Sequence, residues 1–179
     1  MRTIFNVKSY GFKEVDIGNK SIIKKSKDID QLCLGEEIEI IKTQYIVDFD
    51  SMNHNENFEV IINSADYGLT PVILPLSCKN LVYVGYNSCV ALIDVTERKV
   101  EKVITLGSTF YTIVHLVENN ILLIIFELGL AAISENGDMI WEFNTDVIET
   151  YQLEESKFIR LSCMDDSNIR ISLLEGKVK

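Results

Sequence analysis

The sequence predicts an all-β protein built from repeated strand units, and three observations lead to this prediction. A stretch of apolar runs and short turns recurs along the C-terminal part of the chain. No segment has the apolar spacing of an amphipathic helix, with apolar residues at positions i, i+3, i+4 and i+7. The composition is that of a folded domain, because 47% of the 179 residues are hydrophobic and only two are proline.

The repeated stretch begins at Leu81 with LVYVGYNSCVALIDVTERKVEKV. It returns at Ile121 as ILLIIFELGLAAISENGDMIWEF and at Phe158 as FIRLSCMDDSNIRISLLEGKVK. Each copy reads as a strand, a small turn and a second strand, and the first two copies continue through a polar turn into a third strand. In the second copy this turn contains Asn136-Gly137, a dipeptide that favours a two-residue hairpin turn with positive φ at both positions.

A further strand is expected before each copy, so each unit holds about four strands. These preceding strands are expected at residues 71–76, 110–117 and 147–153. The copies begin 40 and then 37 residues apart. A period of this length with four strands in each unit is typical of a β-propeller blade.

The segment Gly129–Phe143, GLAAISENGDMIWEF, resembles the G-x-x-A-hydrophobic-x-x-x-G-x-hydrophobic-x-W-x-F pattern of quinoprotein-type and WD-like propeller blades. The resemblance covers roughly residues 66–179 and implies an architecture rather than an activity, because propellers host many functions. In this segment Gly129, Ala132, Gly137 and Trp141 occupy the positions of the pattern. The segment 90–103 resembles the same pattern, with Ala91 and Asp94 in place but Arg98 instead of the turn glycine.

We therefore expect a partial, or half, β-propeller of about three four-stranded antiparallel blades, preceded by an N-terminal β-hairpin region. The blades are expected at about 66–106, 107–145 and 146–179, and the N-terminal region at 1–65, within one compact domain. Three blades are too few to close a propeller. One possibility is that residues 1–65 supply a degenerate fourth blade. The other is a half-propeller, whose open edge is covered by the N-terminal hairpins or by a partner. The half-propeller is favoured because residues 1–65 lack the hairpin pattern of the later units. Strands in this region are expected at 3–7, 12–17, 37–42, 45–49 and 58–62.

The charge and the cysteines narrow the class of protein. The net charge of −10 disfavours direct binding to nucleic acid, which needs a basic surface. The N-terminus lacks the apolar core of a secretory signal, and no window reaches the ~20 apolar residues of a membrane span. We therefore expect a cytoplasmic protein without membrane contact. The four cysteines form no C-x-x-C pair, so zinc or redox chemistry is not expected, and Cys33 and Cys163 are expected to be core thiols.

The sequence does not predict a catalytic residue, a metal site or a cofactor. His54 and His115 are the two histidines, and neither lies in a nucleophile motif. The segment Asp48–Glu59 has acids at positions 1, 3, 9 and 12 of a calcium loop, but Met52 at position 5 cannot ligate calcium. A long acidic hairpin loop is the favoured reading of this segment. We expect that the protein is not an enzyme.

The acidic residues are concentrated near the C-terminus. Between Glu127 and Asp166 there are ten acids and only two bases, Lys157 and Arg160. We expect this region to bind a basic partner, although a solvated acidic face that aids solubility is the alternative. The expected partner-binding residues are Glu135, Asp138, Glu142, Asp146, Glu149, Glu154, Glu155, Asp165 and Asp166, with Asp48, Asp50 and Glu56 as a secondary group.

In size, charge, composition and architecture, the chain resembles bacterial immunity proteins of contact-dependent growth inhibition and related polymorphic toxin systems. This resemblance implies a protein that binds and neutralises a cognate secreted toxin. A basic ribonuclease is the expected toxin, because a nuclease needs a basic cleft to hold phosphate groups and complementary charge speeds association. The alternative is a non-catalytic propeller-type scaffold or accessory subunit with several weaker protein partners.

Overall fold

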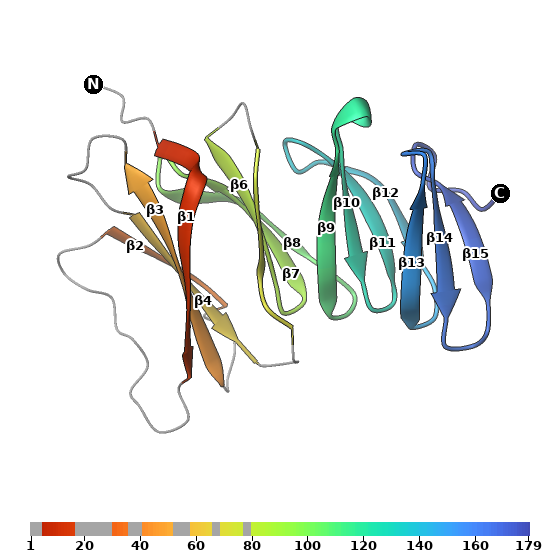
Figure 1. The fold of residues 1–179 in the computed structure, drawn as a ribbon, viewed down its shortest axis with the longest axis horizontal. Helices are drawn as coiled ribbons and strands as arrows, with labels where there is room; N and C mark the ends of the chain where they lie inside the picture. The colour runs from red at the N-terminus through yellow and green to blue at the C-terminus, as the bar shows by residue number, and fades with distance from the viewer. Residues whose placement is uncertain (1–4, 17–29, 36–40, 52–57, 66–68, 77–79) are drawn as a thin grey trace. The chain divides into compact units, whose positions relative to one another are not determined.

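The computed structural model describes residues 5–16, 30–35, 41–51, 58–65, 69–76 and 80–179. These residues form fifteen β-strands and one three-residue 3-10 helix (Figure 1). The strands belong to four small sheets, which confirms the all-β class. The chain forms two compact units, Met1–Val103 and Ile104–Lys179, and each is described by itself.

The first sheet contains strands in the order β1-β3-β4-β2. Strand β3 is antiparallel to β1 and β4, whereas β2 runs parallel to β4. The bounds are β1 Phe5–Asp16, β2 Asp30–Leu34, β3 Thr43–Ser51 and β4 Phe58–Ser64.

Two expectations for this first sheet are corrected. The separate strands expected at 3–7 and 12–17 are one strand, β1, because its pairing with β3 resumes beyond an irregularity between Phe5 and Tyr10. Strand β2 was not expected, since it is short and its parallel pairing with β4 is a non-local contact. The strand expected at 37–42 lies largely outside the described residues, and positions 41–42 precede β3 without being part of it.

The second sheet has its strands in chain order, β5-β6-β7-β8. Their bounds are β5 Val72–Pro75, β6 Leu81–Tyr86, β7 Cys89–Asp94 and β8 Lys99–Thr105. The first and second sheets share one apolar core, to which β3 and β4 contribute Val47, Val60 and Ile62, and β6 and β7 contribute Val84 and Ala91.

A chain of amides joins these two sheets. The buried side chain of Gln44 donates to Asn63 Oδ1 at 2.8 Å. Asn87, in the β6–β7 turn, donates to the Asn63 carbonyl at 3.0 Å and accepts from the Ala65 N–H at 3.2 Å. Asn87 has φ of +46°, a left-handed conformation that asparagine tolerates better than most residues.

The second unit contains the sheets β12-β11-β10-β9 and β13-β14-β15. The third predicted blade therefore has three strands instead of four. A turn follows Ser172, and beyond it Val178 alone makes an antiparallel bridge to Ile171. The bounds are β9 Phe110–Leu116, η1 Val117–Asn119, β10 Ile121–Phe126, β11 Gly129–Ser134, β12 Met139–Asn144, β13 Ile148–Glu154, β14 Phe158–Cys163 and β15 Asn168–Ser172.

The two sheets of the second unit share an apolar core. Alternate residues of β10, such as Leu123 and Ile125, belong to one cluster with Ile159 and Leu161 of β14. All six residues of β10 are buried, which explains why this strand reads as a continuous apolar run rather than an alternating one.

The motif residues have direct structural roles. A Cβ atom at Gly129 would lie 2.4 Å from the Phe143 carbonyl oxygen, so the neighbouring strand leaves room only for hydrogen there. The Trp141 Nε1–H donates to the Leu173 carbonyl at 2.9 Å, and its ring lies against Gly176. Trp141 thereby joins β12 to the segment that follows β15.

The turn after β11 differs from the expected two-residue turn, and that prediction is wrong. Gly137 has φ of +80°, but Asn136 is not in the left-handed region. The Gly137 N–H donates to the Ser134 carbonyl at 2.9 Å, and the Ser134 N–H donates to the Asp138 carbonyl at 2.8 Å. The Ser134 Oγ also accepts from the N–H groups of Asn136 and Asp138, which stabilises this three-residue loop.

Replacing Gly129 by alanine should destabilise the protein, because the new methyl group would overlap the Phe143 carbonyl. We expect the free energy of unfolding to fall by about 1–3 kcal/mol, the usual effect of overpacking. The matched control is Gly107→Ala, where a Cβ atom would meet nothing within 4 Å. Urea denaturation of both variants measures the difference, and equal stability would contradict the packing role of Gly129.

Candidate functional site

The connectivity of the second unit divides the predicted acids between two opposite ends of its sheets. Hairpin-connected strands run antiparallel, so alternate turns lie at opposite ends (Figure 1). One end consists of the β10–β11 turn (127–128), the β12–β13 loop (145–147) and the β14–β15 loop (164–167), and we call it the acidic loop end. Strands of six or seven residues separate the two ends by ~20 Å.

The acidic loop end has four acids and no basic residue. Three of the acids, Asp146, Asp165 and Asp166, were predicted as partner-binding residues. They join Glu127, which is half-buried in the β10–β11 turn. This is a denser set of uncompensated negative charge than the sequence order alone indicates, because the three loops are 15 or more residues apart along the chain.

Backbone hydrogen bonds hold these loops together. The Ile148 N–H donates to the Glu127 carbonyl at 2.8 Å, and the Thr145 N–H donates to the Leu128 carbonyl at 2.9 Å. The Met164 N–H donates to the Val147 carbonyl, also at 2.9 Å. Each loop is therefore bonded to the next, and the acids lie on an ordered frame rather than on independent loops.

Two of the carboxylates are held by local hydrogen bonds. Asp146 Oδ1 accepts from the Val147 N–H at 2.6 Å, and Asp165 Oδ1 accepts from the Ser167 N–H at 3.0 Å. Hydrogen bonds from the side chain and backbone of Ser167 lower the pKa of Asp165. Asp166 follows with φ of +63° and is exposed. Asp165 is therefore ionised at neutral pH. The carboxylates of both Asp146 and Asp165 have defined positions, because each accepts a backbone hydrogen bond.

Exposed apolar side chains lie beside these acids. Leu128 is 39% exposed, and Met164 is 62% exposed. Methionine is enriched in the cores of protein interfaces, where a flexible apolar side chain adapts to its partner. Sequence reasoning missed both residues, because a single apolar residue inside a polar turn gives no periodic signal.

The opposite end of the sheets has a more balanced charge. Its acids are Glu118, Glu135, Asp138, Glu155 and Glu175, and unlike the acidic loop end it also has basic residues, Lys157 and Lys177. Glu135 Oε1 lies 3.1 Å from His115 Nε2, and both side chains are largely buried. The predicted single acidic surface is therefore two surfaces of different character.

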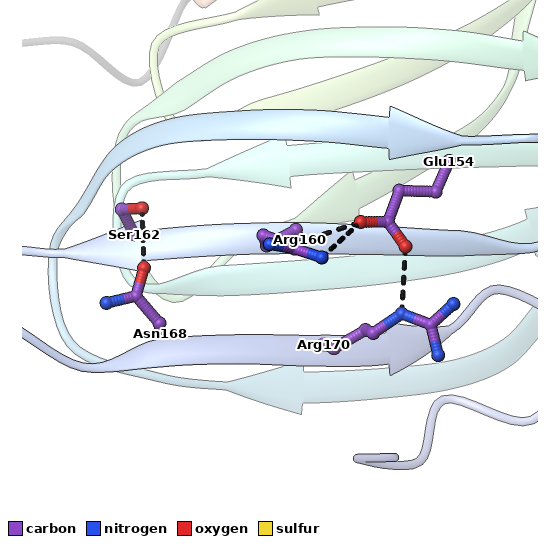
Figure 2. Close-up of polar contacts among 5 residues, drawn as sticks. All are labelled: Glu154, Arg160, Ser162, Asn168 and Arg170. Atoms are coloured by element: carbon purple, nitrogen blue, oxygen red, sulfur yellow. Dashed lines mark hydrogen bonds and ion pairs between the residues drawn. The ribbon is translucent and has the colours of Figure 1, made fainter.

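Glu154 belongs to a third location, the outer face of the sheet β13-β14-β15 (Figure 2). Its carboxylate accepts from Arg160 Nη2 at 2.8 Å and from Arg170 Nε at 2.8 Å. Arg160 and Arg170 are directly opposite each other on β14 and β15, a pairing of like charges that would be unfavourable alone. The Arg170 guanidinium also lies 3.6 Å from the ring centroid of Phe158.

This network changes the interpretation of Glu154. The hydrogen bond from Arg170, together with the charges of Arg170 and Arg160, lowers the pKa of Glu154. Its charge is already shared by two arginines of its own sheet, so it is less available to a partner than the sequence suggested. Ser162 donates to Asn168 Oδ1 at 3.0 Å on the same face, which makes the outer surface of this sheet polar (Figure 2).

The remaining predicted acids are dispersed. Glu142 and Glu149 are exposed on β12 and β13. Asp48 lies on β3 opposite Glu59 of β4, in the first unit. Asp50 is a backbone position of β3, and Glu56 lies outside the described residues.

The described residues contain no group of three or more histidine, cysteine, aspartate or glutamate side chains that could hold a metal ion. His54 and Cys78 lie outside the described residues. Cys163 is buried as a free thiol, which confirms it as a core residue, whereas Cys33 is half-buried. No helix in the described part of the chain has the length and apolar character needed to cross a membrane.

Comparison with known proteins shows the fold alone. The chain matches no known protein-family model and no curated protein sequence. It is similar to the structure of dihydro-heme d1 dehydrogenase NirN, with a TM-score of 0.55 and 11% identity over 76% of this chain and 33% of that one. It is also similar to hydrazine synthase of Kuenenia stuttgartiensis, with a TM-score of 0.54 and 11% identity over 89% of this chain and 50% of that one.

A weaker likeness is to the WD40 β-propeller domain of Doa1, with a TM-score of 0.41 and 11% identity over 83% of this chain and 52% of that one. The chain thus spans between a third and about half of the length of these proteins. Four small sheets of three or four strands resemble propeller blades, and the chain matches part of larger structures.

The Glu154 network should make stability depend on acidic pH. A carboxyl group with a lowered pKa in the folded state stabilises that state above its unfolded pKa of ~4.3, and this stabilisation is lost as the pH falls through the lowered value. Glu154→Gln should therefore lose less stability than the wild type between pH 7 and pH 3, measured by urea denaturation. Glu155→Gln is the matched control, and a pH profile of Glu154→Gln equal to that of the wild type would refute the network's contribution.

Proposed function

We propose that this protein is a non-catalytic inhibitor that binds a basic partner protein through the acidic loop end. The partner we propose is a secreted toxin of the nuclease class, as the resemblance to immunity proteins implies. The single observation that carries the proposal is the set of four acids without a base, held on loops that are hydrogen-bonded to one another.

The chemistry of a nuclease fits this surface. A nuclease binds the phosphates of its substrate in a basic cleft, and carboxylates at defined positions can occupy the same cleft. Because Asp146 and Asp165 are already held by backbone N–H groups, less conformational entropy is lost when a partner binds them. Leu128 and Met164 add apolar area that can be buried in the centre of such an interface.

A second candidate is a scaffold or accessory protein with several weak partners. The blade-like sheets support it, because the same fold serves many unrelated functions. The two candidates differ in affinity and in charge dependence. An inhibitor binds one basic protein tightly and loses affinity steeply as salt is raised, whereas a scaffold binds several proteins weakly.

Neutralising the acidic loop end should weaken binding selectively. The triple variant Asp146→Asn, Asp165→Asn and Asp166→Asn keeps the oxygen atoms that accept backbone hydrogen bonds and removes three charges. Surface charge pairs contribute about 0.2–1 kcal/mol each, so we expect affinity to fall roughly threefold to 150-fold at low salt. The matched control removes three charges at the opposite end, with Glu118→Gln, Asp138→Asn and Glu175→Gln, and should change affinity little.

To find the partner for this measurement, the native cytoplasm is passed over the immobilised chain at low salt. The partner is the basic protein that elutes as the salt concentration is raised. Its nuclease activity is then assayed with and without the added chain. Inhibition by the wild type that is lost in the loop-end variant supports the proposal. Inhibition that is equal in the two triple variants would contradict the role of the acidic loop end, and a partner without nuclease activity would contradict the toxin assignment.

A further inference from the structure

Strand β13 offers an unpaired edge beside the acidic loop end. In the sheet order β13-β14-β15, β13 pairs with β14 alone among the described strands. We propose that the partner adds an extended, basic strand to this edge of β13, an inference that rests on the proposed function. Strand addition of this kind supplies affinity through main-chain hydrogen bonds and specificity through alternate side chains.

The hydrogen-bond pattern identifies which backbone groups face the edge. The Leu173 N–H donates to the Lys157 carbonyl, so the neighbouring pair Phe158–Ser172 is a non-hydrogen-bonded pair. In an antiparallel sheet, the N–H and C=O of Phe158 must then point toward β13, where its partner is Glu154. By alternation along β13, Tyr151 and Leu153 direct their N–H and C=O groups away from β14.

The exposure of β13 agrees with an open edge. Four consecutive residues, Glu149 to Gln152, are exposed, and Tyr151 is 43% exposed. Among the described residues, no backbone hydrogen bond satisfies the outward groups of Tyr151 and Leu153. The ring of Tyr151 can contact a side chain of an added strand, as aromatic residues do across paired strands.

Three other edges in the described sheets carry features that oppose the addition of a strand. Strand β8 carries Lys99 and Lys102, and lysine blocks the addition of another strand. Strand β12 has a register shift opposite Ala132 and Ile133, which bends its edge. The edge of β15 is occupied by Val178 and by the Lys179 N–H, which donates to the Arg170 carbonyl. Strand β13 has neither lysine nor proline, and its own register shift lies between Ile148 and Thr150, before Tyr151 and Leu153.

The charge around β13 selects a basic strand. From Asp146 to Ser156 the chain has four acids and no base. Glu154 is bound by two arginines, so three acids remain available to a basic strand. Asp146 lies just before β13, Glu149 lies in its first half, and Glu155 follows its last residue. Since β13 spans about 20 Å at ~3.3 Å per residue, the added strand needs basic side chains near both of its ends. The start of β13 also emerges directly from the acidic loop end, so one partner can use both features.

The test uses the whole chain and a capped nine-residue peptide in which lysine alternates with threonine and valine. A peptide with glutamate in place of lysine is the charge control. A third peptide keeps the lysines but is N-methylated at every second residue, so that it cannot donate hydrogen bonds along one edge. Affinity is measured by fluorescence anisotropy at low salt, and backbone amide hydrogen exchange is followed by NMR.

We expect the lysine peptide to bind and to slow exchange of the Tyr151 and Leu153 amides by at least roughly tenfold. The glutamate peptide should not bind, and the N-methylated peptide should bind about tenfold more weakly or not at all. Tyr151→Pro removes an outward donor and should abolish protection at Leu153, whereas Tyr151→Thr keeps the N–H group and should retain it. If Tyr151→Pro does not fold, the N-methylated peptide gives the same comparison on the wild-type chain.

The outcomes separate this inference from the proposed function. Binding of the lysine peptide without protection of Tyr151 and Leu153, or equal binding of the N-methylated peptide, overturns strand addition and leaves the acidic loop end in place as a docking surface. No binding of the lysine peptide also overturns strand addition. Conversely, if both amides are protected but the triple aspartate-to-asparagine variant inhibits the toxin as well as the wild type does, strand addition stands and the proposed use of the acidic loop end fails.

Discussion

The apolar interface between the sheets β9–β12 and β13–β15 is the constraint on which the rest of the second unit depends. One face of β10, including Leu123 and Ile125, must be covered, and Ile159 and Leu161 of β14 cover it. This packing sets the orientation of both sheets. It therefore decides which alternate residues of each strand face the core and which face solvent. It also brings the turns that end these strands close enough for backbone hydrogen bonds to join them.

The distribution of charge follows from this packing. Acids that are scattered along forty residues of sequence become an uncompensated group at one end, a partly compensated group at the other, and a single carboxylate bound by two arginines on the outer face. The outer face of β13-β14-β15 carries Glu154, Arg160 and Arg170 and is polar, whereas the opposite face of this sheet contributes Ile159 and Leu161 to the apolar core. The acidic loop end and the β13 edge are the two surfaces that we propose for a partner.

Much of the fold could be predicted from the sequence, because strand and turn signals are local. The copies beginning at Leu81, Ile121 and Phe158 each correspond to a hairpin. The motif glycine Gly129 lies so close to the Phe143 carbonyl that a Cβ atom would not fit. The sequence misled where a distant or competing contact decided the outcome. Ser134 stabilised a three-residue loop in place of the Asn-Gly turn, and β2 paired in parallel with a strand far along the chain.

The sequence by itself determined the all-β class, the blade-like repeats and the excess of negative charge, because alternation, turn residues and composition are readable from neighbouring positions. Only the tertiary structure decided which acids act together. Whether Asp146 lies near Asp165, or Glu154 near Arg170, depends on which strands pair and which ends coincide. Side chains far apart in the chain are brought within bonding distance by strand register, and register is set by the buried face rather than by the charged residues themselves.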